Sequence, residues 1–212
     1  MKTKIFALVA VIISLIGGYI LATQTYKSNE QQAISQIDQS IFLRDYAPRL
    51  GATNPKVYLV EFFDPECESC RAFYPHVKNI LKEHEGQIQL VLRYAPFHPN
   101  AMMVVRILEA ARKQNRYFEV LEVLYMHQPE WGDHHNPRPD LVWTFLGEVD
   151  VDIEQIKKDI NDPQIMANIE QDIKDLETLK IRGTPTFYVN GRPLPSFGLD
   201  QLKSLIKEEI NK

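Results

Sequence analysis

The chain contains two cysteines, Cys67 and Cys70, at the spacing of a redox-active Cys-x-x-Cys pair. An apolar run precedes the pair and a helical pattern follows it, so Cys67 is expected at the N-terminus of a helix. Unpaired backbone N–H groups and the helix dipole stabilise a thiolate at such a position. Because both cysteines fall in this one motif, the sequence has no structural disulfide framework, and the motif itself predicts thiol–disulfide exchange.

The segment before the cysteines is predicted to be a buried strand. Lys56–Phe63 is a run of β-branched, aromatic and aliphatic residues that is too short for an independent helix. Glu61 lies inside this run, where a carboxylate is costly unless it is paired, hydrated or neutral. Either Glu61 points to a sheet edge or a lysine, or it lies buried six residues before Cys67 and is hydrated or neutral.

The sequence after the cysteines predicts a helix and then a second strand. Apolar residues recur at helical spacing from Cys70 to Leu81, with Pro75 inside the helix, where it is expected to cause a kink. Gly86 ends this segment, and Ile88–Tyr94 is the second strand. A strand, a helix and a strand of these lengths indicate a βαβ unit with parallel strands.

Residues from about 96 to 180 have an almost wholly helical pattern, which predicts an inserted helical subdomain. No repeat period is evident, so a solenoid is not expected. The predicted helices are Ala101–Asn115, Arg116–His127, Leu141–Gly147, one marked by Ile153, Ile156 and Ile160, and one marked by Ile165, Ile169, Ile173 and Leu176. Gln128–Pro139 is expected to be a long loop, in which Trp131 packs against the insert and His134 and His135 are solvated.

The last part of the chain predicts a hairpin and a helix. Thr186–Val189 and Arg192–Leu194 flank Asn190-Gly191, which is a strong signal for a two-residue turn. Leu199–Ile210 has the pattern of an amphipathic helix. These elements complete a globular α/β domain.

The N-terminus is predicted to be a membrane anchor. Residues 5–22 carry no charge and would span about 27 Å as a helix, close to the hydrocarbon thickness. The alternative is a signal peptide that is cleaved, although no cleavage site of the usual kind follows cleanly. Lys2 and Lys4 favour a cytoplasmic N-terminus, which places the globular part outside, in an oxidising compartment. The expected division is a transmembrane helix at 1–22, a tether and lead-in helix at 23–50, and the globular domain at 51–212.

The charge pattern argues against a nucleic-acid partner. The formal net charge is −4, with acidic and basic residues interspersed along the chain. A nucleic-acid-binding face needs a basic patch or stripe, and none is visible in the sequence.

The separated motifs together resemble the thioredoxin superfamily, and within it the DsbA-like thiol–disulfide oxidoreductases. The resemblance lies in Val60–Phe63 leading to Cys67–Cys70, in Pro75, and in Ile181–Thr186 leading to Phe187–Gly191. It implies a thioredoxin-like α/β fold, and the helical insert is the feature that is DsbA-like. It further implies an enzyme that acts on cysteines of extracytoplasmic proteins and exchanges electrons with a membrane or thioredoxin-like redox partner.

The resemblance also implies roles for individual residues. Cys67 would be the attacking thiolate, Cys70 the resolving thiol and Glu61 the buried acid that exchanges protons with Cys70. Pro185 would be the cis-proline that faces the sulfurs, and Thr184 would offer its backbone to an extended substrate. No cofactor or metal is implied, because the disulfide is itself the redox group.

The residues between the cysteines, Glu68 and Ser69, depart from the strongly oxidising members, in which a histidine is common. Glu68 would repel the Cys67 thiolate, as would Asp64 and Glu66, and one exposed charge about 4 Å away is worth about 1 kcal/mol in water. The helix dipole opposes this repulsion by a similar amount. We therefore expect a milder oxidant, and a Cys67 pKa below about 4, the range of the most acidified exchange cysteines, would contradict this.

Two other functions stay open at this stage. A disulfide reductase or isomerase would use the same two cysteines in the reverse or shuffling direction. A copper- or zinc-handling chaperone would need a further ligand, for which His76 is the nearby histidine. His98 follows the second strand and approaches the same end of the sheet, but a place at the start of a helix explains it more simply than catalysis.

Overall fold

The computed structural model describes Ile12, residues 15–25 and residues 39–212. The chain divides after Gln39, and Ser40–Lys212 is the unit that carries the sheet and both cysteines. Within this described unit the sheet has five strands in the order β1-β3-β2-β4-β5. The strands are β1 (Arg49–Gly51), β2 (Val57–Phe63), β3 (Ile88–Tyr94), β4 (Thr186–Val189) and β5 (Arg192–Pro193).

Strand β2 lies at the centre of the sheet and carries Glu61 into the core. It runs parallel to β3 and antiparallel to β4, with Glu61 opposite Leu92 on one side and Phe187 on the other. Because side chains alternate along a strand, Glu61 shares a face with Leu59 and Phe63, which belong to the same core cluster as Cys70. The predicted strand is confirmed, and the edge position considered for Glu61 is wrong.

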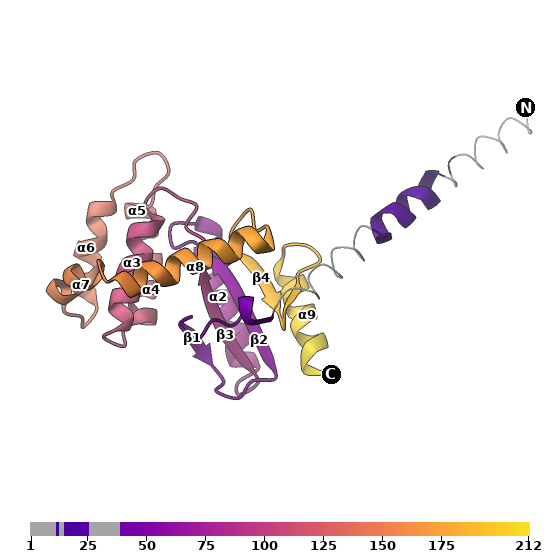
Figure 1. The fold of residues 1–212 in the computed structure, drawn as a ribbon, viewed down its shortest axis with the longest axis horizontal. Coiled ribbons are helices and arrows are strands. Elements are labelled where there is room, and N and C mark those ends of the chain that lie inside the picture. The colour runs from indigo at the N-terminus through magenta and orange to yellow at the C-terminus, as the bar shows by residue number, and fades with distance from the viewer. Residues whose placement is uncertain (1–11, 13–14, 26–38) are drawn as a thin grey trace, which may run out of the picture. The chain divides into compact units, whose positions relative to one another are not determined.

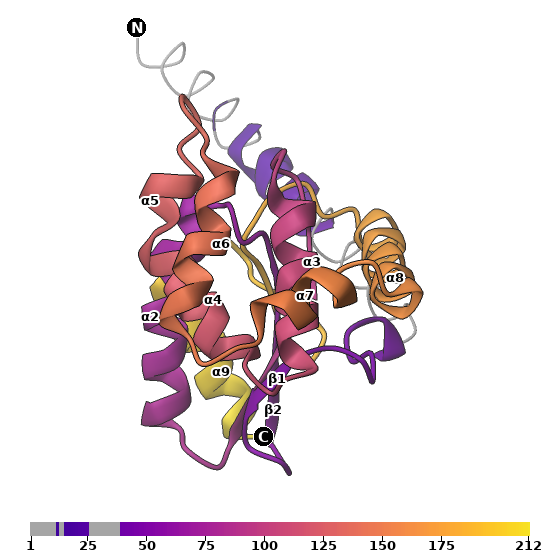
Figure 2. The ribbon, with the colours of Figure 1, turned by 90° about the vertical axis from the view of Figure 1, so that its left-hand side faces the viewer.

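Helices cover both faces of the sheet (Figure 2). α2 (Glu68–Glu83) and α9 (Leu199–Ile210) lie on one side, and α8 (Pro163–Leu179) lies on the other. Strand β2, helix α2 and strand β3 form the predicted parallel βαβ unit. Pro75 lies inside α2, which continues on both sides of it.

The helical insert between β3 and β4 gathers beside the sheet, and α8 leads from it back across the sheet (Figure 1). Its other helices are α3 (Ala101–Arg112), α4 (Tyr117–Met126), α5 (Gln128–Trp131), α6 (Val142–Phe145) and α7 (Ile153–Asp159). The predicted loop Gln128–Pro139 is therefore wrong in its first residues, which form α5. Helix formation there is explained by Trp131, which is fully buried and donates from Nε1 to the Leu124 carbonyl oxygen at 2.8 Å.

The sequence did not predict the edge strand β1. Arg49–Gly51 pairs antiparallel with β3. Gly51 has φ +104°, and a Cβ atom at this position would lie 2.6 Å from the Ile88 carbonyl oxygen, so only glycine fits this close approach. The predicted hairpin is confirmed, with positive φ at both Asn190 and Gly191.

A buried ion network fixes α8 to the sheet. Arg93 on β3 is fully buried and donates from Nε and Nη2 to Asp172 Oδ1 at 2.9 and 2.7 Å. Arg93 also contacts Asp175, which accepts from Arg44 Nη2 at 2.7 Å. The second Asp172 oxygen accepts from the Tyr94 backbone N–H at 2.8 Å. The network thereby joins the lead-in segment, β3 and α8.

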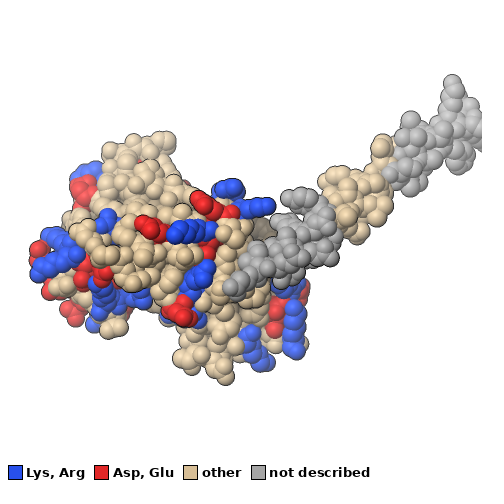
Figure 3. Space-filling model, in the orientation of Figure 1, with Lys and Arg blue, Asp and Glu red and all other residues tan. Residues whose placement is uncertain are grey.

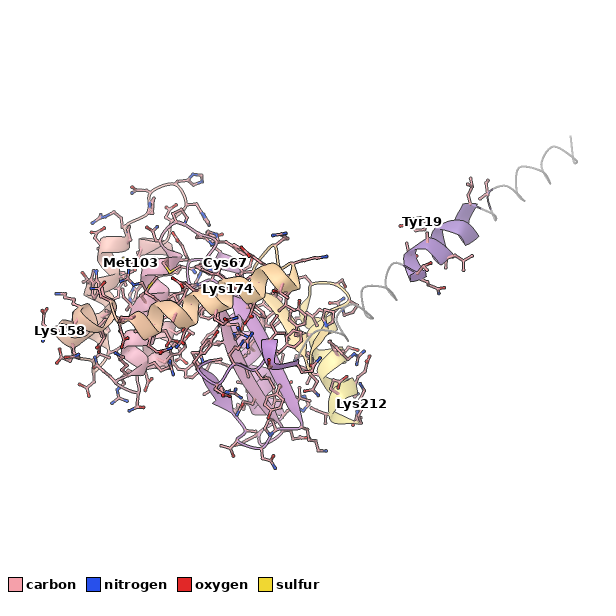
Figure 4. The ribbon with its side chains drawn as sticks, in the orientation of Figure 1. Tyr19, Cys67, Met103, Lys158, Lys174 and Lys212 are labelled. Atoms are coloured by element: carbon pink, nitrogen blue, oxygen red, sulfur yellow. The ribbon has the colours of Figure 1, made fainter. Side chains whose placement is uncertain are left out.

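The N-terminal unit is described in part. Residues 15–25 are helical, and their apolar side chains are exposed, including Tyr19, which Figure 4 labels. None of the helices in the described residues is long and apolar enough to cross a membrane. The predicted membrane helix at 5–22 lies partly outside the described residues. The predicted lead-in helix also lies largely outside the described residues, and the 3-10 turn Gln39–Ile41 is the part of it that the structure describes.

Candidate active site

Cys67 lies at the N-terminus of α2, where the sequence placed it. It is the N-cap residue of the helix and is 7% exposed, while Cys70 is fully buried one turn later. Both cysteines are free thiols. Cys67 Sγ lies 3.4 Å from the carbonyl oxygen of Thr184, to which it donates when it is protonated. In the view of Figure 4, Cys67 lies at the upper end of the sheet.

The surroundings of Cys67 favour its thiolate. The pKa of Cys67 is lowered to about 5, chiefly by the hydrogen bond from the Cys70 side chain. Burial opposes this, whereas hydrogen bonds from the Thr184 side chain and from the backbone N–H groups of Cys70 and Ser69 lower the pKa further. Burial raises the pKa of Cys70 far above its usual range, and the hydrogen bond to Cys67 adds to this increase. The pair thus holds one ionised and one protonated sulfur.

Glu61 is a buried acid behind this pair. Its side chain is almost inaccessible, and its Oε2 atom has no hydrogen-bond partner in the described part of the chain. Burial raises the pKa of Glu61 to about 8, and the nearby negative charge of Cys67 contributes to the increase. Glu61 in turn raises the pKa of Cys70. A protonated carboxyl group therefore lies within electrostatic reach of both sulfurs.

Replacing Glu61 with glutamine is expected to change how stability depends on pH. The folded protein keeps a proton on Glu61 that the unfolded chain, with a pKa near 4.5, gives up. Stability should therefore fall by about 3 kcal/mol between pH 5 and pH 8 through this residue, and the glutamine variant should lack that fall. Urea unfolding of both reduced proteins across this pH range measures the difference.

The Cys67 thiolate contributes with the opposite sign, since its pKa is lowered on folding, but it is present in both proteins and cancels from their difference. Glu68→Gln is the matched control, because Glu68 is exposed. Equal pH slopes for wild type and Glu61→Gln would show that Glu61 is ionised in the folded protein.

The other predicted site residues divide into two groups. Thr184 and Pro185 lie beside Cys67, and the peptide bond between them is cis. Pro185 is buried and Thr184 is half-buried. Glu68 and Ser69, between the cysteines, are both exposed. The Glu68 carboxylate therefore faces solvent at the start of α2, while Ser69 contributes its backbone N–H to the Cys67 environment.

A loop that the sequence did not assign to the site holds the segment before Cys67. Asp64 is fully buried, and its Oδ2 atom accepts from the backbone N–H groups of Phe97 and His98 at 2.7 and 2.9 Å. The His98 imidazole contacts the same oxygen through Nδ1 at 2.9 Å. Glu66, also buried, accepts from the Asn100 backbone N–H at 2.8 Å and from its side-chain Nδ2 at 2.7 Å. Residues 97–100 thus bind both acids.

Gln128 is a second contact that the sequence did not reveal. It is fully buried at the start of α5, and its Nε2 atom donates to the carbonyl oxygens of Pro65 and Cys67 at 2.9 and 3.1 Å. Its Oε1 atom accepts from Arg71 Nε at 2.8 Å. The insert therefore holds the backbone of the cysteine segment in place.

The sequence signal for His98 is its place after the second strand, which already put it at this end of the sheet. Parallel strands end at the same edge of a sheet, so the residues after Ile88–Tyr94 must lie near those after Val57–Phe63. His98 follows the first of these strands by four positions, and Cys67 follows the other by four. Gln128 has no comparable local signal, because its contact depends on how the insert folds back.

A Cys-x-x-Cys pair at a helix N-terminus, facing a cis-proline beside a mixed sheet, defines a thiol–disulfide oxidoreductase with a thioredoxin-like fold. A family model described as Thioredoxin matches residues 44–208. A probable disulfide bond formation protein D from Bacillus cereus is 30% identical over 216 residues, covering 96% of this chain and 93% of the relative. The chain belongs to the DsbA-like thiol–disulfide oxidoreductase family of the thioredoxin superfamily.

The chain is also similar to a solved structure and to part of a longer protein. The crystal structure of a thioredoxin-like oxidoreductase from Silicibacter pomeroyi has a TM-score of 0.71 and 27% identity, covering 83% of this chain and 99% of that chain. The Na(+)/H(+) antiporter NhaA 3 of Salinispora tropica is 30% identical over 145 residues, which is 67% of this chain. This chain spans only 21% of the length of that antiporter.

Proposed function

We propose that the chain exchanges disulfides with cysteines of extracytoplasmic proteins through Cys67 and Cys70, as an oxidase milder than the strongly oxidising members. In the oxidised enzyme, a substrate thiolate attacks Cys67 Sγ and forms a mixed disulfide. The Cys67–Cys70 bond breaks, and Cys70 leaves as a thiolate that takes the proton of Glu61. A second substrate thiolate then attacks the substrate sulfur and releases the Cys67 thiolate. The substrate gains a disulfide, and the enzyme pair takes up two electrons.

The observation that carries this proposal is the stabilised Cys67 thiolate beside a buried, protonated Cys70. A stabilised thiolate favours the reduced enzyme, so the disulfide is donated more readily. With a pKa of about 5, Cys67 is ionised at neutral pH. Its pKa lies between those of thioredoxin, about 7, and of the strongest oxidants, about 3.5.

The surface around the pair supports a protein substrate. Phe197 is 57% exposed and its ring lies 4.6 Å from that of Phe73, which follows Cys70 by three residues on α2. The ring centroid of Phe73 also lies 5.9 Å from that of Phe187 on β4, which follows the Thr184–Pro185 segment. The exposed Phe197 and the half-buried Phe73 offer an apolar contact to an extended chain with apolar side chains near its cysteine. Thr184 is proposed to bind the backbone of that chain.

The proposed location is the outer side of the cytoplasmic membrane. The uncharged run at 5–22, preceded by Lys2 and Lys4, supports a single-pass anchor with the catalytic domain outside, and secretion after signal cleavage is the alternative. A membrane or thioredoxin-like partner would accept the electrons that the pair collects. The charged groups on the face in Figure 3 are of both signs and interspersed, which fits protein substrates better than nucleic acid.

The equilibrium reduction potential of the full chain in glutathione buffers tests the direction of exchange. Lowering a thiol pKa from about 7 to about 5 stabilises the reduced pair at pH 7 by about 1.7 decades, or about 50 mV. Starting from about −270 mV for thioredoxin, we expect a value near −220 mV, which is less oxidising than about −120 mV. A reduction potential near −270 mV would contradict the proposed oxidase function and would favour a reductase or isomerase.

A further inference from the structure

Two acids next to Cys67 are unfavourably placed for its thiolate. Asp64 and Glu66 lie within three residues of Cys67, and both are almost fully buried. Buried charges are poorly screened, so two free carboxylates here would oppose the ionisation of Cys67. The thiolate is more stable when these charges are compensated.

The loop between β3 and α3 supplies the compensation in two chemically different ways. Glu66 is bound by the neutral N–H donors of Asn100. Asp64 is bound by backbone N–H groups and, in addition, by the imidazole of His98, a group that can carry a full positive charge. The His98 side chain is 23% exposed, so it can exchange its proton with solvent.

We propose that His98 is a charge-compensating and positioning residue for Cys67, whose protonated imidazole neutralises Asp64 and thereby makes the oxidising strength of the pair depend on pH. This inference rests on the proposed function, in which Cys67 is the exchanging thiolate. His98 then serves the role that a histidine between the cysteines would serve, from a different element of the fold.

The direction of the pH dependence follows from the groups that face His98. These are Asp64 and Glu66 before α2, Cys67 at its N-cap, and His134 on the loop after α5, whose ring lies 5.1 Å from that of His98. Burial lowers the pKa of His98, but Asp64, Cys67 and Glu66 together raise it above its usual value. Below that pKa, Asp64 is neutralised and the thiolate is favoured. Above it, Asp64 keeps its backbone N–H donors but no longer faces a positive charge, so the thiolate is less favoured.

His98→Gln tests the inference, because glutamine can still donate a hydrogen bond to Asp64 but cannot carry charge. The readout is the rate at which iodoacetamide alkylates Cys67 in the reduced full chain across pH 4 to 9, followed by mass spectrometry. We expect the apparent pKa of Cys67 to rise by about one unit. The disulfide-exchange constant with glutathione should shift about tenfold toward the oxidised enzyme, which corresponds to about 30 mV.

Two further variants keep the test decisive. His134→Gln removes the neighbouring ring without touching Asp64 and should alkylate as the wild type does. His98→Lys restores a positive charge that does not titrate near neutral pH. The pKa of Cys67 should therefore return to about its wild-type value, and the stabilisation of the thiolate should persist above pH 7. A His98→Gln profile equal to that of the wild type would overturn the inference. A wild-type Cys67 that reacts only above pH 8 would instead overturn the proposed function.

Discussion

Replacing Cys67 with serine is expected to abolish disulfide exchange with a disulfide-containing peptide, leaving only the rate of the buffer thiols. With a pKa of about 5, almost all of Cys67 is thiolate at pH 7, whereas an ordinary thiol with a pKa of about 8.5 is only a few per cent ionised. A serine hydroxyl does not ionise in this range. The measurement is the release of the free peptide thiol, together with the mass of any covalent adduct.

Cys70→Ser is the contrasting variant. This variant keeps a hydroxyl donor for Cys67, so the Cys67 thiolate should still attack the peptide disulfide. The resulting mixed disulfide can no longer be resolved, because the second sulfur is absent. A stable adduct on Cys67 should therefore accumulate in this variant and be absent from Cys67→Ser. Ser69→Ala, on the exposed residue between the cysteines, should exchange as the wild type does. An adduct on Cys70 in the Cys67→Ser protein would reverse the two assigned roles.

Replacing Arg93 with methionine is expected to destabilise the protein by about 3–5 kcal/mol. Arg93 is fully buried and binds Asp172 and Asp175, which are also buried. Removing one partner of a buried ion pair leaves an uncompensated charge in the core, and its desolvation is no longer offset. Urea unfolding of the reduced protein at pH 7 measures the loss.

The pH dependence separates this explanation from a simple packing defect. Protonated carboxyl groups need no cation, so the stability difference between wild type and Arg93→Met should shrink as the pH falls from 7 to 4. Lys203→Met is the matched control, because Lys203 forms an exposed pair with Glu83 at 3.3 Å, and it should cost less than about 1 kcal/mol. A pH-independent loss in Arg93→Met would indicate lost packing instead of lost charge compensation.

Much of the fold could be predicted because the chain uses strong local signals. The apolar run around Glu61, the helix after Cys70 and the Asn190-Gly191 turn all specify their own local structure. Strand β1 was missed because its three residues carry no apolar pattern and become a strand only by pairing with β3. Helix α5 was missed because its stability comes from the burial of Trp131, which depends on the rest of the insert.

The site was predictable in its sulfurs and much less so in its electrostatics. Cys67 and Cys70 are recognisable from spacing alone, and Glu61 stands out as a charge in an apolar strand. Asp64 and Glu66 were read from the sequence as free charges that repel the thiolate. In the structure both are buried and bound by residues 97–100, a long-range contact that no local pattern encodes. How far their charges are compensated therefore could not be worked out from the sequence.

The two parts of the site, the cysteine segment and the Thr184–Pro185 segment that faces it, are synthesised at different times. Thr184 lies 117 residues after Cys67, and β4, which pairs with the central strand, follows it directly. At about 5–20 residues per second, the ribosome needs roughly 6 to 23 s to add that stretch. During this interval the nascent chain carries both sulfurs without the segment that faces them, and the central strand lacks one of its neighbours. Catalytic competence therefore arises late in synthesis, when the C-terminal segment that begins at Thr184 joins the sheet.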